Sequence, residues 1–452
     1  MTTHKITKGF DLRLAGAPAR TLVDAPEPSH VAVGTAEFSG IKPKVLVKEG
    51  DDVVTGQPIF LDKVDRDVVF CSPATGRVTS IEYGERRFLR RVVIENAAAF
   101  GKADAEKFAD ARMPASDRAS LRKAIKNAGL WHLFVQRPIG KMPRGDQAPV
   151  AIFVNGMDTA PLAADPAFAV AGCKGALQRG IDLLQQLTDG PIHLSLHAAG
   201  PDQSDLRDLR DVEVHDFAGP HPAGLTGTHI SRLQPLKSGE IAYCLRLQDL
   251  VRLGSWAETG RYPAQTVIAM SGSAAPARQY YRIRHGAPVS SLNGGAAIGG
   301  DVRVIDGNVL AGRAIAADGE LGFRTTTLTV IPEGTDQRDL FGWAVPAFGK
   351  LSRSRSVFSW LSPKKEYVVD ARLNGGQRPI VNIGAWDEVT PLDIYPSYLL
   401  RAIQCGDLEE AIKLGLLEVT EEDVALCTFV DASKIDVGSV IRSGLDLYEK
   451  EG

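Results

Sequence analysis

Two different spacings of hydrophobic and polar residues occur along the chain, and they predict different kinds of structure. Between residues 28 and 98, short apolar runs rich in Val are broken by turns such as EGDD, TGQP and ATG. Short strands separated by Gly-, Pro- and Asp-containing turns are typical of a small β-domain. The two halves of this stretch are alike, which predicts two small sheets packed together, preceded by an N-terminal segment at residues 1–27.

From residue 146 the pattern changes to strand, helix and strand. An apolar run at 150–154 leads into an Asn-Gly turn, apolar residues recur at helical spacing over 169–190, and IHLSLH at 192–197 alternates apolar and polar residues. Buried strands that alternate with helices are typical of a parallel α/β unit. We therefore predict a Rossmann-like α/β domain over residues 146–255.

The remaining segments complete the predicted architecture. Residues 262–335 are rich in strand and turn signals, and residues 385–452 carry apolar residues at 3.6 spacing. Residues 99–145 are expected to form a helical connector, and 336–384 a basic and aromatic connector. The predicted fold class is multidomain α/β and β, with a lipoyl-like barrel-sandwich hybrid at 28–98, the Rossmann-like α/β domain, a small β-grasp domain at 262–335 and a C-terminal helical domain.

The composition limits the compartment and the partners. The 452 residues carry a formal net charge of −3, with 44% hydrophobic and 24% charged residues, which is ordinary for a globular protein in water. This charge gives no general attraction to nucleic acid, so we expect no nucleic-acid partner. The sequence contains neither a run of eighteen apolar residues nor a signal peptide, and we expect a cytoplasmic chain without a transmembrane helix.

The cysteine and histidine spacings argue against a metal centre. The closest two of the five cysteines are about twenty residues apart, which predicts neither a disulfide framework nor a zinc or iron–sulfur site. His193 and His197 are four residues apart on a predicted strand, which separates them by about 13 Å and excludes a shared ion. We expect both histidines to face solvent or an interface, and we predict no metal site.

A loop rich in Gly, Pro and His stands out between residues 219 and 230. Its sequence, GPHPAGLTGTHI, contains His221, Gly224 and His229. Two histidines supply half of a zinc site, and threonine is seldom a nucleophile away from a chain terminus. We favour a rigid loop that fixes a turn or contacts a partner, and a role for either histidine in acid–base chemistry stays open.

Several stretches of the chain resemble one family from end to end. ITKGFDLRLAGAP, GLWHLFVQRP, MDTAPLAADP, NIGAWDEVTPLDI, EEDVALCTFV and above all FAGPHPAGLTGTHI are similar to the A subunits of the sodium-translocating NADH:quinone oxidoreductases. The resemblance implies a subunit of a membrane-bound oxidoreductase that passes electrons from NADH to ubiquinone and pumps Na⁺. It implies a peripheral position on the cytoplasmic side of the bacterial inner membrane, next to a membrane subunit linked to quinone, without an independent catalytic centre.

The family is similar in turn to the electron-input subunit of Rnf complexes and to the flavin-bearing subunit of complex I. Those relatives hold FMN on a glycine-rich loop, because backbone N–H groups can approach a phosphate where no Cβ intervenes. At the corresponding residues 127–143, bulky side chains such as Trp131 and Phe134 replace the glycines, and Cys427 is the one cysteine left where the relatives carry a cluster. We therefore predict that FMN and iron–sulfur clusters are absent.

Two sets of residues are candidates for function within this resemblance. An emptied flavin cleft would be lined by Trp131, Phe134, Arg137 and Lys141, which we predict to contribute to ubiquinone binding. A second set lies in the basic and aromatic stretch 347–365, which contains no acid, and we predict that it docks on the membrane or on a partner: Lys350, Arg353, Arg355, Phe358 and Trp360.

Each candidate set has an alternative. The chain could be a scaffold subunit with no ligand site, and the stretch 347–365 could be a solvated loop over a domain joint. A soluble flavin dehydrogenase that acts alone is a weaker alternative, because the expected flavin loop is missing.

Overall fold

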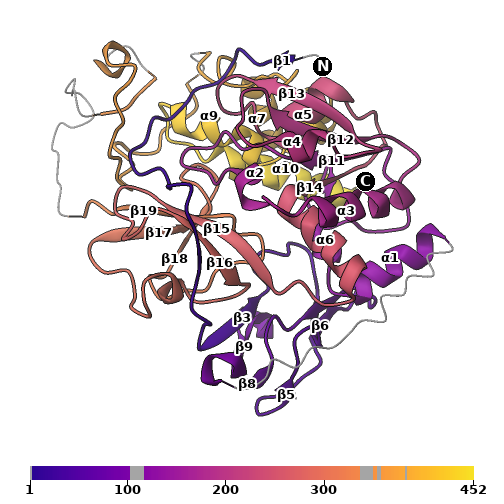
Figure 1. Cartoon of the computed structure of the whole chain (residues 1–452). Helices are drawn as coiled ribbons and strands as arrows, with labels where there is room; N and C mark the ends of the chain where they lie inside the picture. The colour runs from indigo at the N-terminus through magenta and orange to yellow at the C-terminus, as the bar shows by residue number, and fades with distance from the viewer. Residues whose placement is uncertain (1–2, 102–116, 336–349, 354–357, 382–383, 452) are drawn as a thin grey trace.

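The computed structural model of the chain describes residues 3–101, 117–335, 350–353, 358–381 and 384–451 (Figure 1). Within these residues the strands form four sheets, two of six strands, one of four and one of three. Both six-stranded sheets recruit a short strand from the N-terminal segment. This segment therefore ties the layers together, because β1 (Thr3–Lys5) and β2 (Leu22–Asp24) join different sheets.

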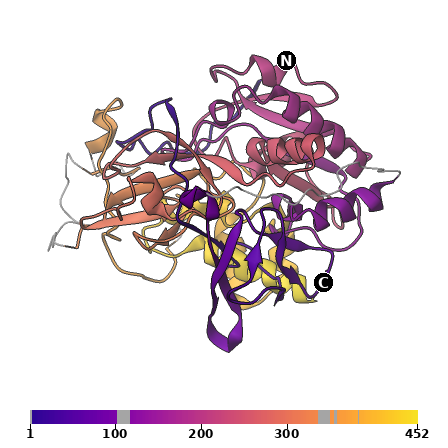
Figure 2. The same ribbon diagram turned by 60° about the horizontal axis from the view of Figure 1, so that its bottom comes forward.

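The two smaller sheets form the N-terminal β-domain, which projects as a lobe at the bottom of Figures 1 and 2. Antiparallel strands and tight turns build it, in agreement with the short apolar runs of the sequence. Its interior holds Phe60, Val78, Val92 and Ile94, which are wholly buried. The strands are β3 (His30–Gly34), β4 (Pro43–Val45), β5 (Asp52–Val53), β6 (Pro58–Asp62), β7 (Val69–Cys71), β8 (Gly76–Tyr83) and β9 (Leu89–Glu95).

The second domain is a sheet of order β1-β13-β12-β11-β14-β10, parallel except for the edge strand β10. The predicted strands at 150–154 and 192–197 and the helix between them are confirmed. The strands are β10 (Val135–Arg137), β11 (Ala151–Asn155), β12 (Ile192–His197), β13 (Glu213–Ala218) and β14 (Ala242–Arg246).

Helices cover both faces of this sheet. On one face α3 (Lys174–Leu187) packs against α6 (Leu247–Thr259). The two helices approach closely at Gly254, where an added Cβ would lie 1.8 Å from the Ala176 carbonyl oxygen. On the other face α5 (Thr226–Leu233) packs Ile230 against Phe153. The shorter helices α1 (Arg118–Asn127), α2 (Pro166–Ala169) and α4 (Ser204–Arg207) lie around these layers.

Because helices cover both faces, the expectation that the histidines on 192–197 face solvent or an interface is wrong for His193, which lies inside the domain. Its side chain is buried, with its ring 4.9 Å from that of Phe153 and 5.1 Å from that of His215. His197, at the end of the same strand, is half-buried. The alternation of apolar and polar residues predicted that one face of the strand is exposed to solvent. A histidine can nevertheless lie on a covered face when its ring nitrogens are hydrogen-bonded.

The third layer is a mixed sheet of order β18-β17-β19-β15-β16-β2. It lies at the left of Figure 1, beside the α/β domain and above the N-terminal β-domain. Leu328 and Val330 of its central strand are wholly buried. The strands are β15 (Gln265–Ser271), β16 (Tyr280–Arg284), β17 (Val302–Asp306), β18 (Arg313–Ile315) and β19 (Thr327–Pro332).

Helices dominate the C-terminal part, drawn in yellow in Figures 1 and 2. They are α7 (Pro396–Cys405), α8 (Leu408–Lys413), α9 (Ala425–Val430) and α10 (Val437–Glu451). Apolar residues at helical spacing, such as Leu399, Ile441 and Leu445, form a core of their own. A search of the described helices finds none with the length and apolar composition needed to cross a membrane.

Candidate functional site

A cavity of about 980 Å³ lies where the α/β sheet, the mixed sheet and the C-terminal helices meet. Ala311 and Ser439 at its rim are exposed, so the cavity opens to solvent. Its volume is in the range of ligand sites in proteins. It is lined by residues of the N-terminal β-domain, the connector before β11, the α/β domain, the mixed sheet and the C-terminal part. The charged lining residues include Glu37, Arg137, Asp158, Arg246, Asp306, Arg324, Glu422 and Arg442.

The order of the parallel strands places this cavity. The chain runs from β11 outward through β12 and β13 and then returns to β14, on the other side of β11. Such a reversal leaves a crevice beyond the carboxyl ends of the two central strands, where ligands of open α/β sheets bind. Asp158 follows β11 and Arg246 ends β14, and both line the cavity. The cavity therefore occupies the switch point of the sheet.

An ion pair and hydrogen bonds hold the side chains of Arg246, Arg324 and Glu37 in this cavity. Arg246 forms a bidentate pair with Asp249, with nitrogen–oxygen distances of 2.8 and 3.0 Å. Arg324 donates from its guanidinium to the His132 carbonyl oxygen at 2.8 Å. The Glu37 carboxylate accepts the backbone N–H groups of Phe323 and Arg324, each at 3.0 Å. These contacts fix the guanidinium groups in place before any ligand enters.

Three carboxyl groups in the cavity, those of Glu37, Asp158 and Glu422, have raised pKa values, chiefly because the surrounding protein desolvates them. The side chains of Asp158 and Glu422 are exposed where they face the cavity, but the surrounding protein partly desolvates them, which raises the pKa of Asp158 to about 6 and that of Glu422 to about 7. Asp423 and Asp158 raise the pKa of Glu422 further, while Arg137 and Arg246 oppose the shift. Near neutral pH the Glu422 carboxyl can therefore donate a hydrogen bond or accept a proton.

Most of the residues predicted to contribute to quinone binding do not line this cavity. Trp131 and Phe134 are 0% exposed, with ring centroids 5.1 Å apart, and they fill the core beside Tyr243. The two rings therefore do not line an open cleft, because they themselves occupy the space. The intervening residues Leu133 and Val135 line the cavity instead.

The two basic members of the predicted wall hold the C-terminal helices. Arg137 lines the cavity and pairs with Asp423 at 2.6 Å, and their side chains are only 8% and 3% exposed. Lys141 pairs with Asp446 at 2.7 Å and Glu449 at 2.6 Å on α10. Of the four predicted residues, Arg137 alone lines the cavity.

Sequence reasoning missed the acidic residues of the cavity. Asp158 stands four residues after the apolar strand at 150–154, at the carboxyl end where α/β sheets bind ligands, and this position was a usable signal. Glu422 and Arg324 come from distant parts of the chain, and their convergence depends on how the layers pack.

Comparison with known proteins identifies the family. Residues 4–97 match the family described as the NqrA N-terminal barrel-sandwich hybrid domain, 116–262 the NqrA second alpha/beta domain, and 267–317 the NQRA C-terminal domain. The chain is 39% identical over 450 residues to the A subunit of the Na(+)-translocating NADH-quinone reductase of Yersinia pestis bv. Antiqua (strain Angola), and the match covers 99% of this chain and 100% of that protein.

The chain belongs to the NqrA family, the A subunits of Na⁺-translocating NADH-quinone reductases. The relative from Neisseria meningitidis serogroup B (strain ATCC BAA-335 / MC58) is 38% identical, and the one from Serratia proteamaculans (strain 568) is 39% identical. Each match covers 99% of this chain and 100% of the relative. The resemblance seen in the sequence is thus confirmed, as is membership of an oxidoreductase complex.

The Gly- and His-rich stretch of this NqrA-family chain is a junction of three segments. The His221 backbone N–H donates to Asp11 Oδ1 at 2.8 Å, and its ring nitrogen lies 3.2 Å from Thr159 Oγ1. Gly224 donates its N–H to the same Thr159 hydroxyl at 2.9 Å, and a Cβ added at Gly224 would lie 2.6 Å from the Thr159 backbone nitrogen. The loop therefore joins the N-terminal segment to the end of β11.

The second half of that stretch is helical, because α5 begins at Thr226. His229 on this helix is buried, with Nε2 3.0 Å from the Ala223 carbonyl oxygen and its ring 4.3 Å from that of Phe217. Burial lowers the pKa of His229 to about 3 and that of His221 to about 4. Both imidazoles are thus neutral and serve as hydrogen-bonding parts of the fold.

The predicted docking residues fall partly outside the described residues. Arg355 lies outside them, and of Phe358 only the backbone is described, at the start of the 3₁₀ turn η5 (Phe358–Leu361). Lys350 is half-buried, and Arg353 pairs with Glu388. Trp360 is 55% exposed. Figure 1 draws this part of the chain in orange at the edge of the molecule opposite the N-terminal β-domain.

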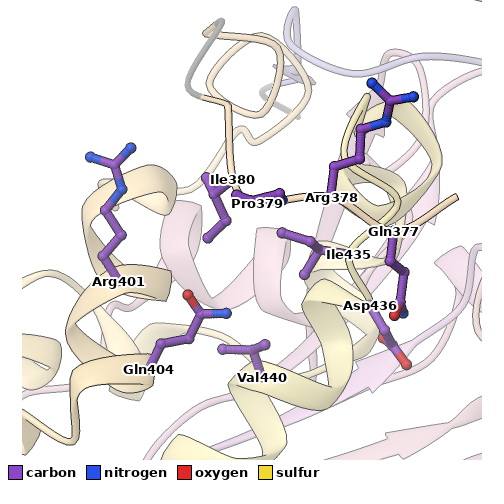
Figure 3. Close-up of a pocket in the computed structure, with 9 residues that line it drawn as sticks. All are labelled: Gln377, Arg378, Pro379, Ile380, Arg401, Gln404, Ile435, Asp436 and Val440. Atoms are coloured by element: carbon purple, nitrogen blue, oxygen red, sulfur yellow. The ribbon is translucent and has the colours of Figure 1, made fainter.

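A second hollow, of about 580 Å³, lies in the C-terminal part (Figure 3). Figure 3 shows Ile380, Ile435 and Val440 turned toward the hollow, with Arg378 and Arg401 at its sides. Asp436 lines both this hollow and the central cavity, so the two lie next to each other.

All five cysteines are free thiols. Cys427 is buried, with its sulfur 3.2 Å from Thr390 Oγ1, and burial raises the pKa of its thiol to about 12. Cys244 lines the central cavity, and burial also raises its pKa to about 12. Thiols that stay protonated at neutral pH are poor metal ligands and nucleophiles.

Proposed function

We propose that this NqrA-family chain is a peripheral subunit on the cytoplasmic side of the bacterial inner membrane. It docks on a membrane subunit through the stretch around Trp360 and contributes to quinone binding through the central cavity. Relatives that match over their full length are named as subunits of Na⁺-translocating NADH-quinone reductases, and this supports a place in that complex. The cavity at the switch point is the observation that carries the quinone proposal.

The chemistry of the cavity suits a polar, uncharged headgroup. A quinone headgroup has carbonyl oxygens that accept hydrogen bonds, and guanidinium groups such as those of Arg137 and Arg246 are donors fixed by ion pairs. The cavity lining contains seven carboxyl and five guanidinium groups, so it offers no excess of positive charge to a phosphate. A neutral headgroup avoids that mismatch.

The test fills the cavity mouth without touching its ion pairs. Ala311 is exposed at the rim, and an Ala311→Trp substitution would block entry. Ala316, which is exposed in the same region but lies outside the lining, gives the matched control Ala316→Trp. A water-soluble ubiquinone analogue should bind the purified chain and the Ala316→Trp variant equally, and the Ala311→Trp variant at least tenfold more weakly. Equal binding by all three would refute the cavity as the quinone site.

One observation favours a scaffold without a ligand as the second candidate. Trp131 and Phe134 fill the space that an open flavin cleft would leave, and the ion pairs of the cavity also join the domains to each other. The same titration separates the two candidates, because a scaffold would bind no quinone analogue. An absorbance spectrum of the chain as purified from its native complex would test the predicted absence of FMN and iron–sulfur clusters, since either would absorb in the visible range.

Exposed apolar side chains support docking through the region after residue 359. Half of the large apolar side chains that are exposed among the described residues lie between 360 and 398: Trp360, Leu361, Val368, Leu373, Val381, Tyr395 and Tyr398. Exposed apolar groups next to basic ones are typical of membrane-surface or subunit contacts.

The docking proposal predicts that assembly depends on these side chains. The variant Lys350→Gln, Arg353→Gln and Trp360→Ser removes two cations and one aromatic ring. The matched control removes the same groups from the N-terminal β-domain, as Arg86→Gln, Arg87→Gln and Phe88→Ser, all of which are exposed. Two cations near anionic lipid contribute about 2 kcal/mol, roughly 30-fold in binding. Equal co-purification of both variants with the membrane subunits would exclude this docking surface.

A further inference from the structure

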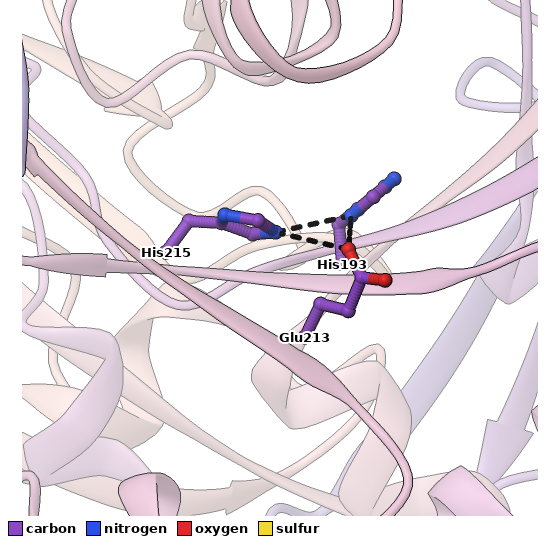
Figure 4. A group of neighbouring side chains, drawn as sticks. All are labelled: His193, Glu213 and His215. Atoms are coloured by element: carbon purple, nitrogen blue, oxygen red, sulfur yellow. Dashed lines mark hydrogen bonds and ion pairs between the residues drawn. The ribbon is translucent and has the colours of Figure 1, made fainter. Parts of the chain in front are cut away.

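Two imidazoles and a carboxylate meet on the face of the α/β sheet that α5 covers (Figure 4). β12 and β13 pair in parallel, with His193 opposite Glu213 and Ser195 opposite His215. Side chains two residues apart on a strand share a face, so His193, Glu213 and His215 converge. His193 Nδ1 lies 3.1 Å from His215 Nε2 and 3.2 Å from Glu213 Oε2, and the last two atoms are 3.6 Å apart.

We propose that His193, His215 and Glu213 form a binding site for a divalent transition-metal ion, with zinc as the ion that fits best. Zinc binds nitrogen and oxygen ligands at about 2.0–2.1 Å in tetrahedral geometry, which separates neighbouring ligand atoms by roughly 3.3 Å. The three edges measured here, 3.1, 3.2 and 3.6 Å, have that size. Two histidines and one carboxylate are a known zinc ligand set.

The hydrogen bonding around His193 directs its lone pair toward the site. His193 Nε2 lies 3.3 Å from the Gln234 side-chain oxygen, which can accept its proton. A neutral imidazole has one ring proton, so with Nε2 protonated the Nδ1 lone pair points at His215 and Glu213. Metal-ligating histidines commonly donate their second nitrogen to such an orienting group.

Burial of the three groups suits an ion that enters from solvent. The side chains of His193 and His215 are 6% and 20% exposed, while that of Glu213 is 61% exposed. The open side next to Glu213 leaves room for water as a fourth ligand.

This site is separate from the central cavity. His193 and Glu213 stand at the beginning of their strands, whereas the cavity lies beyond the carboxyl ends of β11 and β14. A five-residue strand spans about 16 Å, so the two sites lie at opposite ends of the strands. Failure of the quinone proposal therefore leaves the metal site untouched. Bridging β12 and β13 there would brace the edge of the sheet where β1 joins.

The test is zinc binding by the full chain, purified without a polyhistidine tag, in competition with a chromophoric chelator. We expect one Zn²⁺ per chain. Glu213→Ala, at an exposed position that leaves the fold intact, should weaken binding at least tenfold, and Gln234→Ala, which removes only the orienting group, roughly 10- to 100-fold. His193→Gln with His215→Gln should abolish stoichiometric binding.

A histidine on the same strand supplies the matched control. His197→Gln removes an imidazole outside the triangle and should leave zinc affinity unchanged. Co²⁺ bound in a tetrahedral site of the wild-type chain should give strong visible absorption bands, absent from Glu213→Ala. Equal zinc affinity of the wild-type chain and Glu213→Ala would overturn the proposal, as would a loss in His197→Gln as large as in the double variant of His193 and His215, since either result means adventitious binding.

Discussion

The buried pair of Arg137 and Asp423 gives the most direct test of how the C-terminal helices are held. Arg137 ends β10, and Asp423 lies in the 3₁₀ turn η7 (Glu422–Val424) just before α9. Asp423 Oδ2 also accepts the backbone N–H of Thr420 at 2.9 Å and its hydroxyl at 3.0 Å. Because both side chains are nearly buried, solvent cannot replace the partner that either charge would lose.

Removing one partner leaves the other charge buried and uncompensated, which costs about 3–5 kcal/mol. Asp423→Leu, similar in shape, should reach the upper end of that range because Thr420 also loses its acceptor. Arg137→Met should cost less, since the Asp423 carboxylate keeps both Thr420 donors. The double variant should be more stable than the sum of the two losses predicts, by about 2 kcal/mol or more.

Amide hydrogen exchange of α9 and α10 is the suitable assay, because a chain of several domains does not unfold as one two-state unit. A loss of about 3–5 kcal/mol should speed exchange there a few hundred- to a few thousand-fold. Lys141→Met is the matched control, since Lys141 also ties this connector to α10 but its partners are partly exposed, and it should cost less than about 1 kcal/mol. Strictly additive single losses would refute the reasoning.

Three further predictions concern stability and reactivity. His221 and His229 are buried neutral with pKa values of about 4 and 3, so the unfolded chain binds more protons below about pH 6.5, and local stability should fall by about 2 kcal/mol per histidine from pH 7 to pH 5, measured by amide hydrogen exchange of α5 corrected for the intrinsic pH dependence of exchange; unchanged protection would contradict this. Gly254→Ala should destabilise the α3–α6 contact by about 1–3 kcal/mol, seen as faster amide hydrogen exchange in these two helices, whereas a neutral effect would mean that the helices can separate freely. A thiol reagent should label the exposed Cys405 rapidly and Cys427, whose pKa is raised to about 12, only on unfolding; equal rates would disprove its burial.

The sequence predicted the elements whose pattern is local. The strands at 150–154 and 192–197 were found because apolar runs and alternation reflect burial along one strand, and the Gly-marked helix ends are local signals as well. The boundaries and the names Rossmann-like and β-grasp stay predictions. The topology shows that the first 27 residues supply strands to two sheets, which no local pattern could indicate because β1 and β2 have three residues each.

Residues that meet across strands or layers were beyond the sequence. His193 and His215 are 22 residues apart, and their contact depends on the register of β12 against β13. A shift of one residue would send the two side chains to opposite faces. Trp131 was expected at an open cleft because its position aligns with a ligand loop, yet an indole of that size gains most when it is buried, and it donates to the Pro143 carbonyl oxygen at 2.9 Å inside the core.

The burial of Trp131 and its neighbours also bears on which ligands suit the switch-point cavity. A phosphate needs backbone N–H groups free of Cβ atoms and a positive field. Here the stretch 131–137 forms a 3₁₀ turn and the edge strand β10, and the backbone of that strand pairs with β14. Four of the five guanidinium groups that line the cavity, those of Arg137, Arg246, Arg313 and Arg442, are paired with carboxylates, so they can donate hydrogen bonds but carry little uncompensated charge. A nucleotide would therefore lack both of these anchors in the cavity, whereas the proposed ligand, a neutral quinone ring with carbonyl oxygens, needs neither.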